Sequence, residues 1–300
     1  MISDYHDRNT RSRAMSWHQS SVYVGTVAGG VLGGFFAEWF GWRTGFYFFG
    51  LAGIGLGLIL SRRLREPARG QADLEAPLAR QSLSVRQAVR EIFRTPTAVL
   101  LMVVFVGANF VAMMFLTWMP TFLGEKFGLR LTVAGLTGTV FIQFASAIGA
   151  PMGGFCADRL ARRHPGGRIL VQASGLLAGS TFVFLTGTTA AVGHLMLWMT
   201  IFGFCKGLYD ANIFASLYDV VHPSARATAA GVMNAVGWLG GAFAPVITGW
   251  IVSRGGPANE VKLLGNALAF GGTIYLGAAI LLFATVIFRA RRDVVEDWRG

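Results

Sequence analysis

Residues 97–119 read TAVLLMVVFVGANFVAMMFLTWM and contain no charged side chain. A run of this length exceeds the roughly 20 apolar residues with which an α-helix crosses a bilayer. A soluble core does not need many such helices, so the sequence predicts an all-α integral membrane protein with eight transmembrane helices. The seven further runs of similar character lie at residues 16–37, 43–61, 132–154, 168–188, 193–217, 227–252 and 264–288.

Positive charges are distributed unevenly between the two sets of connecting segments. The start of the chain, the segments after the second, fourth and sixth runs, and the C-terminus together hold 20 of the 26 Lys and Arg residues. Because cytoplasmic loops are enriched in Lys and Arg, we expect a multi-pass protein of the cell membrane with both termini in the cytoplasm. These loops, lying against the lipid bilayer, explain the net charge of +11 without a nucleic-acid partner.

The remaining composition argues against a metal site and against an enzyme. Cys156 and Cys205 form no CxxC pair, and the five histidines have no metal-ligand spacing. The sequence has no phosphate-binding glycine loop, no HExxH motif and no nucleophile at a suggestive spacing from a histidine. We therefore expect no cofactor, no metal and no catalytic residue.

Residues 62–95 form the long connection on the predicted cytoplasmic side. Its second half has apolar residues at helical spacing between arginines, which predicts a short amphipathic helix on the inner membrane surface. Ser82 or Ser84 is expected to cap this helix, and Thr95 and Pro96 to end it. An unstructured tether is the alternative interpretation. The apolar face of the predicted helix consists of Val85, Val89, Ile92 and Phe93.

An internal repeat relates the first apolar run to the seventh. A shift of 212 residues places Gly25 on Gly237 and Gly29 on Gly241, and each run follows an Arg-Ala pair. Glycines four residues apart allow two helix backbones to approach closely, which is typical of packed membrane helices. The repeat indicates that the two runs occupy equivalent places in two related halves.

After the fourth run the chain reads GFCADRLARR over residues 154–163. This segment resembles the cytoplasmic loop motif G-x-L-A-D-R-x-G-R-R of the major facilitator superfamily. It matches six of the eight defined positions, with Cys156 in place of Leu and Ala161 in place of Gly. The first run, which leads into Gly41-Trp42-Arg43, is similar to the fifth helix of that family where it leads into the sixth.

The resemblance implies a domain organisation in which the eight runs correspond to helices five to twelve of a twelve-helix fold. Residues 1–61 would be the last two helices of the N-terminal half, 62–95 the cytoplasmic linker, and 96–300 the six-helix C-terminal half. The expected fold is thus a truncated form of the family fold that lacks the first four helices. Those helices, if they are encoded upstream, would be a partner of this chain.

Two short segments bear on the subgroup within this family. Residues 118–123 and 218–223 resemble organic-anion and sugar-acid symporters and their spinster-like relatives. Gly29-Gly30 stands where drug-exporting antiporters typically have Gly-Pro. The resemblance therefore implies secondary active transport of a small organic anion, a sugar acid or carboxylate, driven by protons. A drug or cation antiporter and a transporter-like sensor that does not transport are the alternatives.

The sixth run carries the main candidates for the substrate and proton pathway. Lys206 and Asp210 lie one helical turn apart, and Tyr209 lies beside them. Two interpretations are open, since charges inside a membrane are costly unless they are paired. The two groups form a neutral pair that lets the helix tolerate both charges. Alternatively, Lys206 attracts an anionic substrate group and Asp210 accepts a proton.

Further polar and aromatic side chains within other runs are weaker candidates for lining a central cavity. Such residues also form hydrogen bonds between helices, which is the alternative role for each of them. The weaker candidates are Asn109, Gln143, Asn234 and Trp238.

The charged loop residues are candidates for gating. By resemblance, Asp158 and Arg159 form a cytoplasmic latch in which the aspartate meets the helix dipole at the start of the first run, near residues 14–17. Asp219 and Arg226 are candidates for a second latch. The alternative is that these charges only orient the loops.

Overall fold

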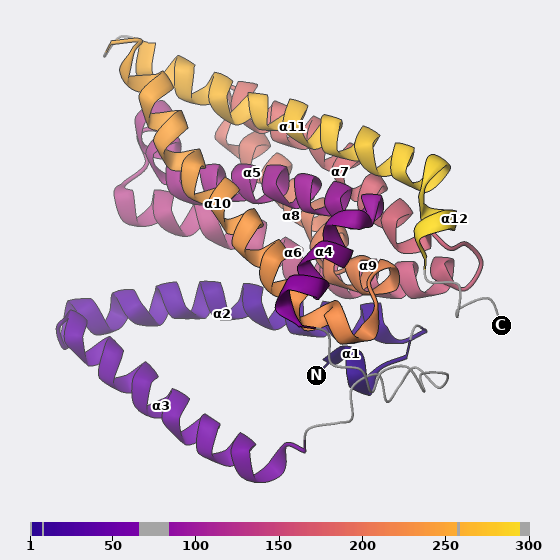
Figure 1. Ribbon diagram of the computed structural model, residues 1–300. Helices are drawn as coiled ribbons and strands as arrows, with labels where there is room; N and C mark the ends of the chain where they lie inside the picture. Colours follow the sequence, from indigo (N-terminus) through magenta and orange to yellow (C-terminus); the bar gives the residue numbers. More distant parts are fainter. Residues whose placement is uncertain (1, 8, 66–83, 257–258, 295–300) are drawn as a thin grey trace.

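The computed structural model describes residues 2–7, 9–65, 84–256 and 259–294 of the chain. Within these ranges the secondary structure is helical (Figure 1). The α-helices are α1 (Ile2–Tyr5), α2 (Arg11–Trp39), α3 (Trp42–Arg63), α4 (Val85–Arg94), α5 (Pro96–Phe127), α6 (Leu131–Ala161), α7 (Gly167–Thr188), α8 (Val192–Asp210), α9 (Ile213–Val220), α10 (Arg226–Ser253), α11 (Glu260–Phe288) and α12 (Ala290–Asp293).

Seven of the described helices are long and apolar enough to cross a membrane, namely α2, α3, α5, α6, α7, α10 and α11. The eighth expected span, residues 193–217, is divided where α8 ends at Asp210 and α9 begins at Ile213. At this break the side-chain amide of Asn212 donates a hydrogen bond to the Leu208 carbonyl at 3.0 Å, a local bond that competes with regular helix. The count of eight spans therefore stays a prediction.

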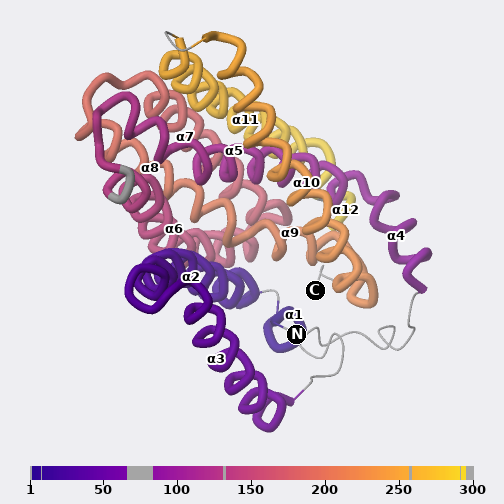
Figure 2. The backbone as a smooth tube through the Cα atoms, turned by 90° about the vertical axis from the view of Figure 1, so that its left-hand side faces the viewer, coloured from indigo at the N-terminus to yellow at the C-terminus, as the bar shows by residue number. Residues whose placement is uncertain are grey.

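Helices α5 to α11 form one bundle, and the α2–α3 hairpin lies beside it. Within the bundle α7 packs along α11, α6 along α8, and α10 along α5. Helix α2 packs on α6, whereas α3 turns back at Phe40, diverges from α2 and leaves most of its side chains exposed (Figure 1 and Figure 2). The hairpin is thus attached to the bundle mainly through α2.

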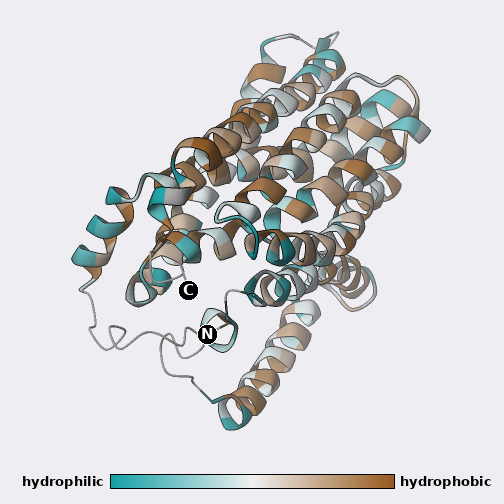
Figure 3. Cartoon of the chain, turned by 90° about the vertical axis from the view of Figure 1, so that its right-hand side faces the viewer, coloured by the Kyte–Doolittle hydropathy of each residue, from teal (hydrophilic) through white to brown (hydrophobic). Residues whose placement is uncertain are grey.

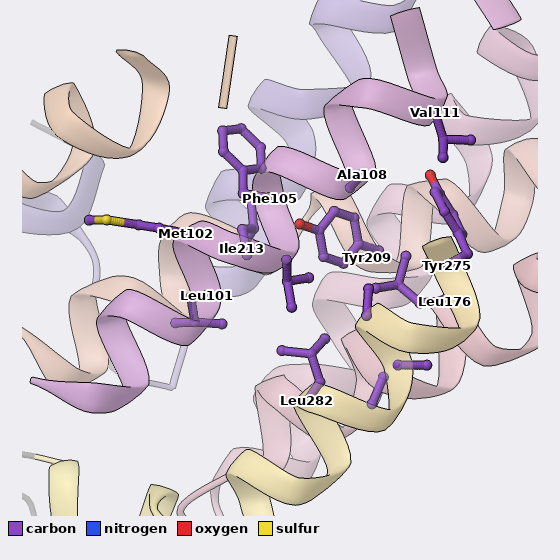
Figure 4. Packing of buried hydrophobic residues seen from close by; sticks show 14 of the residues in the cluster. Leu101, Met102, Phe105, Ala108, Val111, Leu176, Tyr209, Ile213, Tyr275 and Leu282 are labelled. Carbon is purple, nitrogen blue, oxygen red and sulfur yellow. The ribbon is translucent and has the colours of Figure 1, made fainter. Parts of the chain in front are cut away.

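The core of the bundle is mainly apolar, and it also holds buried polar residues such as Gln172 and Asn212. Hydrophobic residues cover the bodies of the helices, while hydrophilic residues gather at helix ends and on α4 (Figure 3). Inside, Leu101 and Phe105 of α5, Leu176 of α7 and Leu282 of α11 belong to one continuous cluster (Figure 4). In a membrane, where lipid is as apolar as these side chains, close packing rather than the hydrophobic effect holds such helices together.

Glycines bring α6 and α8 into backbone contact. A Cβ atom on Gly203 would lie 2.4 Å from the carbonyl oxygen of Ile142, and one on Gly149 would lie 2.3 Å from that of Phe204. Ser146 adds a hydrogen bond across the same interface, donating to the Gly203 carbonyl at 2.8 Å. The two helices can approach this closely only because these positions carry no side chain.

The two glycine-rich helices of the internal repeat differ in their surroundings. On α10 a Cβ atom at Gly237 would lie 2.3 Å from the Phe105 ring, and one at Gly241 would lie 2.9 Å from the Met113 side chain, so this face packs on α5. On α2, a Cβ atom at the equivalent positions, Gly25 and Gly29, would have no atom of another described segment within 4 Å. The glycine face of α2 is therefore open.

Helix α4 lies in the second half of the linker. Ser84 caps it in a capping box, in which its hydroxyl accepts from the Gln87 backbone N–H at 3.3 Å, and the helix ends before Pro96. The buried residues are Ala88 and Ile92, because α4 packs against α10 and α5. The alternative cap Ser82 and the rest of 66–83 lie outside the described residues, and contact of α4 with the membrane stays a prediction.

Two members of the predicted apolar face of α4 are not used in this packing. Val85 is 71% exposed and Phe93 is 56% exposed. The packed face is thus rotated toward Ala88 relative to the predicted one. Val85 and Phe93 stay available for another apolar surface.

Candidate functional site

A cavity of about 360 Å³ lies between α2 and the bundle, and it is lined by residues of α2, α5, α6, α8, α9 and α10. The sequence-predicted pathway residues that line it are Lys206, Asp210, Asn109, Gln143, Asn234 and Trp238. These six residues lie on four different helices, so the tertiary structure gathers them around one space.

The charged pair of α8 lies in this cavity. Lys206 and Asp210 form an ion pair, and their side chains are only 13% and 15% exposed. The hydroxyl of Tyr23, on α2, hydrogen-bonds to the carboxylate of Asp210 and accepts from the Lys206 ammonium at 3.2 Å. The ammonium also lies 4.7 Å from the centre of the Tyr23 ring, within the range of a cation–π contact.

Tyr209 lies elsewhere, although it adjoins Asp210 in sequence. Its side chain points into the apolar core near Leu176 and Tyr275 (Figure 4), and its hydroxyl has no hydrogen-bond partner among the described residues. Consecutive residues of a helix point about 100° apart, and at this turn of α8 the cavity lies on the side of Asp210. The structure therefore separates Tyr209 from the other predicted pathway residues.

The uncharged lining residues differ in how they are held. The side-chain amide of Asn109 donates to the Phe105 carbonyl of its own helix at 2.9 Å. Trp238 is 55% exposed and lines the cavity from α10 together with Asn234. Gln143 lines it from α6. Amide and indole groups at these places can donate hydrogen bonds to the oxygens of a polar ligand.

A second polar cluster lies where α2 begins. The carboxylate of Asp158, near the end of α6, accepts hydrogen bonds from the backbone N–H groups of Ser12 at 3.1 Å and Arg13 at 2.9 Å. Thr10, the residue before the helix, provides no side-chain cap. Asp158 thus satisfies first-turn N–H groups of α2 and meets the positive end of its dipole. The contact falls before residues 14–17 because α2 begins earlier than the sequence predicted.

The motif glycine allows this contact to form. A Cβ atom on Gly154 would lie 2.7 Å from the Ser12 carbonyl oxygen and 2.7 Å from the Ser16 hydroxyl. A side chain here would push α2 away from α6. Arg159, next to Asp158, is exposed.

The cluster extends through buried arginines to the end of α9. Arg168, at the start of α7, pairs with Asp158 at 3.0 Å and also with Asp219, and its Nε donates to the Ser12 hydroxyl at 2.6 Å. Arg11 pairs with Asp219 at 3.4 Å. We call Arg11, Asp158, Arg168 and Asp219 the charge network.

Arg226 is held differently from the expectation of a second latch with Asp219. Its Nε donates to the Tyr218 carbonyl at 3.3 Å, while Asp219 points to Arg168 and Arg11. The two arginines that pair with this carboxylate come from α2 and α7, which are distant in the sequence, so sequence spacing could not identify them. Arg11 and Arg168 therefore take the place of Arg226 as the ion-pair partners of Asp219.

Sequence reasoning did not identify Tyr23, Arg11 or Arg168 as site residues. Arg11 and Arg168 lie in segments whose positive charges indicate only the orientation of the chain. The signal that could have identified Tyr23 is its place in the first run one helical turn after Gln19, which also lines the cavity. Within the described residues, no group of three or more His, Cys, Asp or Glu could hold a metal.

The arrangement agrees with comparisons to known families. The sequence model of the Major Facilitator Superfamily matches residues 1–199 and 134–299. The chain belongs to this superfamily. Solved structures support the same fold. The bacterial homolog of the human lysosomal transporter Spinster, in an inward-facing and unoccupied conformation, aligns with a TM-score of 0.58 at 22% identity, covering 99% of this chain and 74% of that one.

A second solved structure, the human organic anion transporter MFSD10, aligns with a TM-score of 0.67 at 18% identity. The alignment covers 94% of this chain and 66% of that one.

Curated relatives of this superfamily chain are transporters. The probable L-galactonate transporter of Escherichia coli K12 is 25% identical over 84% of this chain and 58% of its own length. The hexuronate transporter of Bacillus subtilis 168 is 23% identical over 96% of this chain and 68% of its own length. The cis,cis-muconate transport protein of Acinetobacter baylyi is 26% identical over 91% of this chain and 65% of its own length. The chain thus spans 58% to 68% of the length of these three relatives.

Proposed function

We propose that this superfamily member takes part in secondary active transport of a small organic anion of the sugar-acid or carboxylate class, coupled to protons. The observation that carries the proposal is the Lys206 ammonium in the cavity between α2 and the bundle. A cation inside a membrane protein marks a substrate or ion pathway more often than not. The names of the relatives, which transport galactonate, hexuronate or muconate, support an anionic substrate.

Charge balance supports the coupling to protons. The Lys206–Asp210 pair is neutral and largely buried, so an entering carboxylate would leave one uncompensated negative charge there. A proton on Asp210 restores neutrality. The other groups that face the pair are Tyr23 and His18 of α2, and both line the same cavity. We therefore expect uptake to increase as the external pH falls.

The charge network is proposed as the gate on the cytoplasmic side. It ties α2 to α6 through the N–H groups of Ser12 and Arg13, to α7 through the Ser12 hydroxyl, and to α9 through Arg11, and a rigid-body movement of α2 would break these contacts together. In this arrangement residues 1–61 belong to one half and 96–300 to the other, with 62–95 joining them, and both termini are cytoplasmic. Alternating access then requires the network to open when α2 moves.

The function is tested by uptake of radiolabelled D-glucuronate and L-galactonate into cells that express the chain. We expect Lys206→Ala to reduce uptake at limiting substrate roughly tenfold or more, because a hydrogen bond to a charged group is lost. Asp210→Asn should remove the dependence on external pH, whereas His18→Asn should retain it. Normal uptake by Lys206→Ala, with equal expression, would contradict the proposal.

The alternatives give different results in the same cells. A drug or cation antiporter would extrude cationic compounds, and replacement of Lys206 would strengthen binding of a cation by removing repulsion. A sensor would bind a sugar acid without accumulating it. The Lys206 ammonium favours the anion transporter over the antiporter.

A further inference from the structure

Tyr23 is the point at which α2 enters the charged centre of the cavity. The residue is 3% exposed, and its hydroxyl lies within hydrogen-bond distance of both Lys206 and Asp210. The face of α2 that lines the cavity also includes His18, Gln19, Val22 and Thr26. Among the described residues of this face, only Tyr23 forms hydrogen bonds with Lys206 and Asp210.

The two donors converge on one carboxylate oxygen. The same atom, Oδ2 of Asp210, accepts hydrogen bonds from the Lys206 ammonium and from the Tyr23 hydroxyl. Lys206 Nζ and Tyr23 Oη are themselves 3.2 Å apart. An ammonium and a phenolic hydroxyl at this spacing present two donors to a single oxygen, which is a suitable geometry for binding any carboxylate.

We propose that Tyr23 and Lys206 together form a carboxylate subsite, and that the side chain of Asp210 occupies it when no substrate is bound. This inference rests on the proposed function and specifies how the anion is recognised. A substrate carboxylate takes the place of the Asp210 carboxylate and accepts from the same two donors. The exchange keeps the number of hydrogen bonds constant, so the donors are never left unsatisfied in the cavity.

The subsite has a consequence for the movement of the two halves. Tyr23 lies on α2 and Lys206 on α8, so a carboxylate held by both side chains joins helices that belong to different parts of the fold. A ligand can shift a conformational equilibrium only through contacts that differ between the two states. Tyr23 supplies such a contact, because movement of α2 removes its hydroxyl from Lys206.

The test compares Tyr23→Phe with Tyr275→Phe, a matched control that removes the same atom from a buried tyrosine outside the cavity. Uptake of D-glucuronate and L-galactonate is measured as a function of concentration. We expect Tyr23→Phe to raise the KM about tenfold with little change in maximal rate, since one hydrogen bond to a charged group is lost. Tyr275→Phe should stay within about twofold of the wild type.

Two further measurements separate recognition from a structural role. D-glucuronate should inhibit Tyr23→Phe about tenfold less well than the wild type. D-glucuronamide is uncharged and its oxygen accepts a weaker hydrogen bond, so its inhibition should differ much less between the two proteins. Asp210→Asn removes the competing carboxylate, so purified Asp210→Asn protein should bind D-glucuronate more tightly than the wild type. Adding Tyr23→Phe to the Asp210→Asn variant should remove this increase in affinity for D-glucuronate.

The outcomes distinguish the subsite from the function on which it rests. If the wild type accumulates and binds neither sugar acid, the proposed function fails and the subsite fails with it. If wild-type uptake is normal while Tyr23→Phe matches Tyr275→Phe in KM and in inhibition by both compounds, the subsite alone is overturned. A loss that affects acid and amide equally, together with a lower thermal midpoint, would also overturn it.

Discussion

Single residues show how far neighbouring side chains on one helix can differ in role. Asp210 faces the cavity and Tyr209 faces the apolar core, although they are adjacent in the chain. The sequence identifies both as polar residues inside an apolar run, but polarity does not say in which direction a side chain points. The direction follows from which helices pack on each side of α8, and that depends on the whole bundle.

The separation of Tyr209 from the cavity leads to a test. Tyr209→Phe removes a buried hydroxyl that has no partner among the described residues, so the cost of burying this group is relieved. We expect unchanged uptake kinetics and an equal or slightly higher thermal midpoint in detergent. A large increase in KM would show that Tyr209 reaches the substrate.

Arg168 is expected to contribute strongly to stability. It is fully buried and compensates two aspartates, so Arg168→Gln leaves Asp158 and Asp219 with fewer partners. Breaking a buried charge network of this kind typically costs about 3 kcal/mol or more. The measurement is the thermal midpoint of the purified protein. Arg159→Gln, which replaces an exposed arginine next to Asp158, is the control and should change stability little.

Helix packing depends on positions where no side chain fits. The α6–α8 interface is one example, since a Cβ atom on Gly203 would lie 2.4 Å from a carbonyl oxygen of α6. The glycine-rich sequence predicts close packing somewhere along the helix. It does not tell which glycines are used, because that requires knowing which helix lies opposite.

Glycines at a helix interface and glycines on an exposed helix face should differ in how much their replacement by alanine lowers stability. Gly203→Ala should destabilise the protein by about 1–3 kcal/mol, because the helices must separate to admit the methyl group. Gly29→Ala, on the open face of α2, should have little effect on this bundle because no atom of another described segment lies within 4 Å of the added carbon. Equal losses for the two variants would contradict the close packing of α6 on α8.

For the molecule as a whole, the charge network attaches the α2–α3 hairpin to the bundle. Asp158→Asn should weaken this attachment, since a carboxylate interacts with a helix N-terminus more strongly than an amide does. The readout is maleimide labelling of Ser20→Cys, buried between α2 and α6, in a background with Cys156 and Cys205 replaced by serine. We expect labelling to become severalfold faster.

The control for this experiment is Asp7→Asn. Asp7 accepts hydrogen bonds only from nearby residues such as Thr10 among its described contacts, so it does not join α2 to the bundle. Its replacement should leave the labelling rate unchanged. If Asp158→Asn also leaves the rate unchanged, the network does not act as a latch.

Orientation in the membrane is a prediction of the charge distribution, and it can be tested from both sides. Cys156 is exposed near the end of α6, on the predicted cytoplasmic side. Ala190, between α7 and α8, is exposed on the opposite side. An impermeant maleimide should label Ala190→Cys in intact cells and Cys156 only after permeabilisation. The reverse pattern would invert the topology.

The amino-acid sequence was sufficient for the membrane character, the position of most helices, the family motif and six residues of the cavity. These features depend on hydropathy, charge and spacing within continuous segments, which need no knowledge of packing. Tyr23 beside Lys206, the partners of Asp219 and the burial of Tyr209 required the folded structure. Each joins or separates residues on different helices, and which helix faces which is settled only when the whole bundle packs.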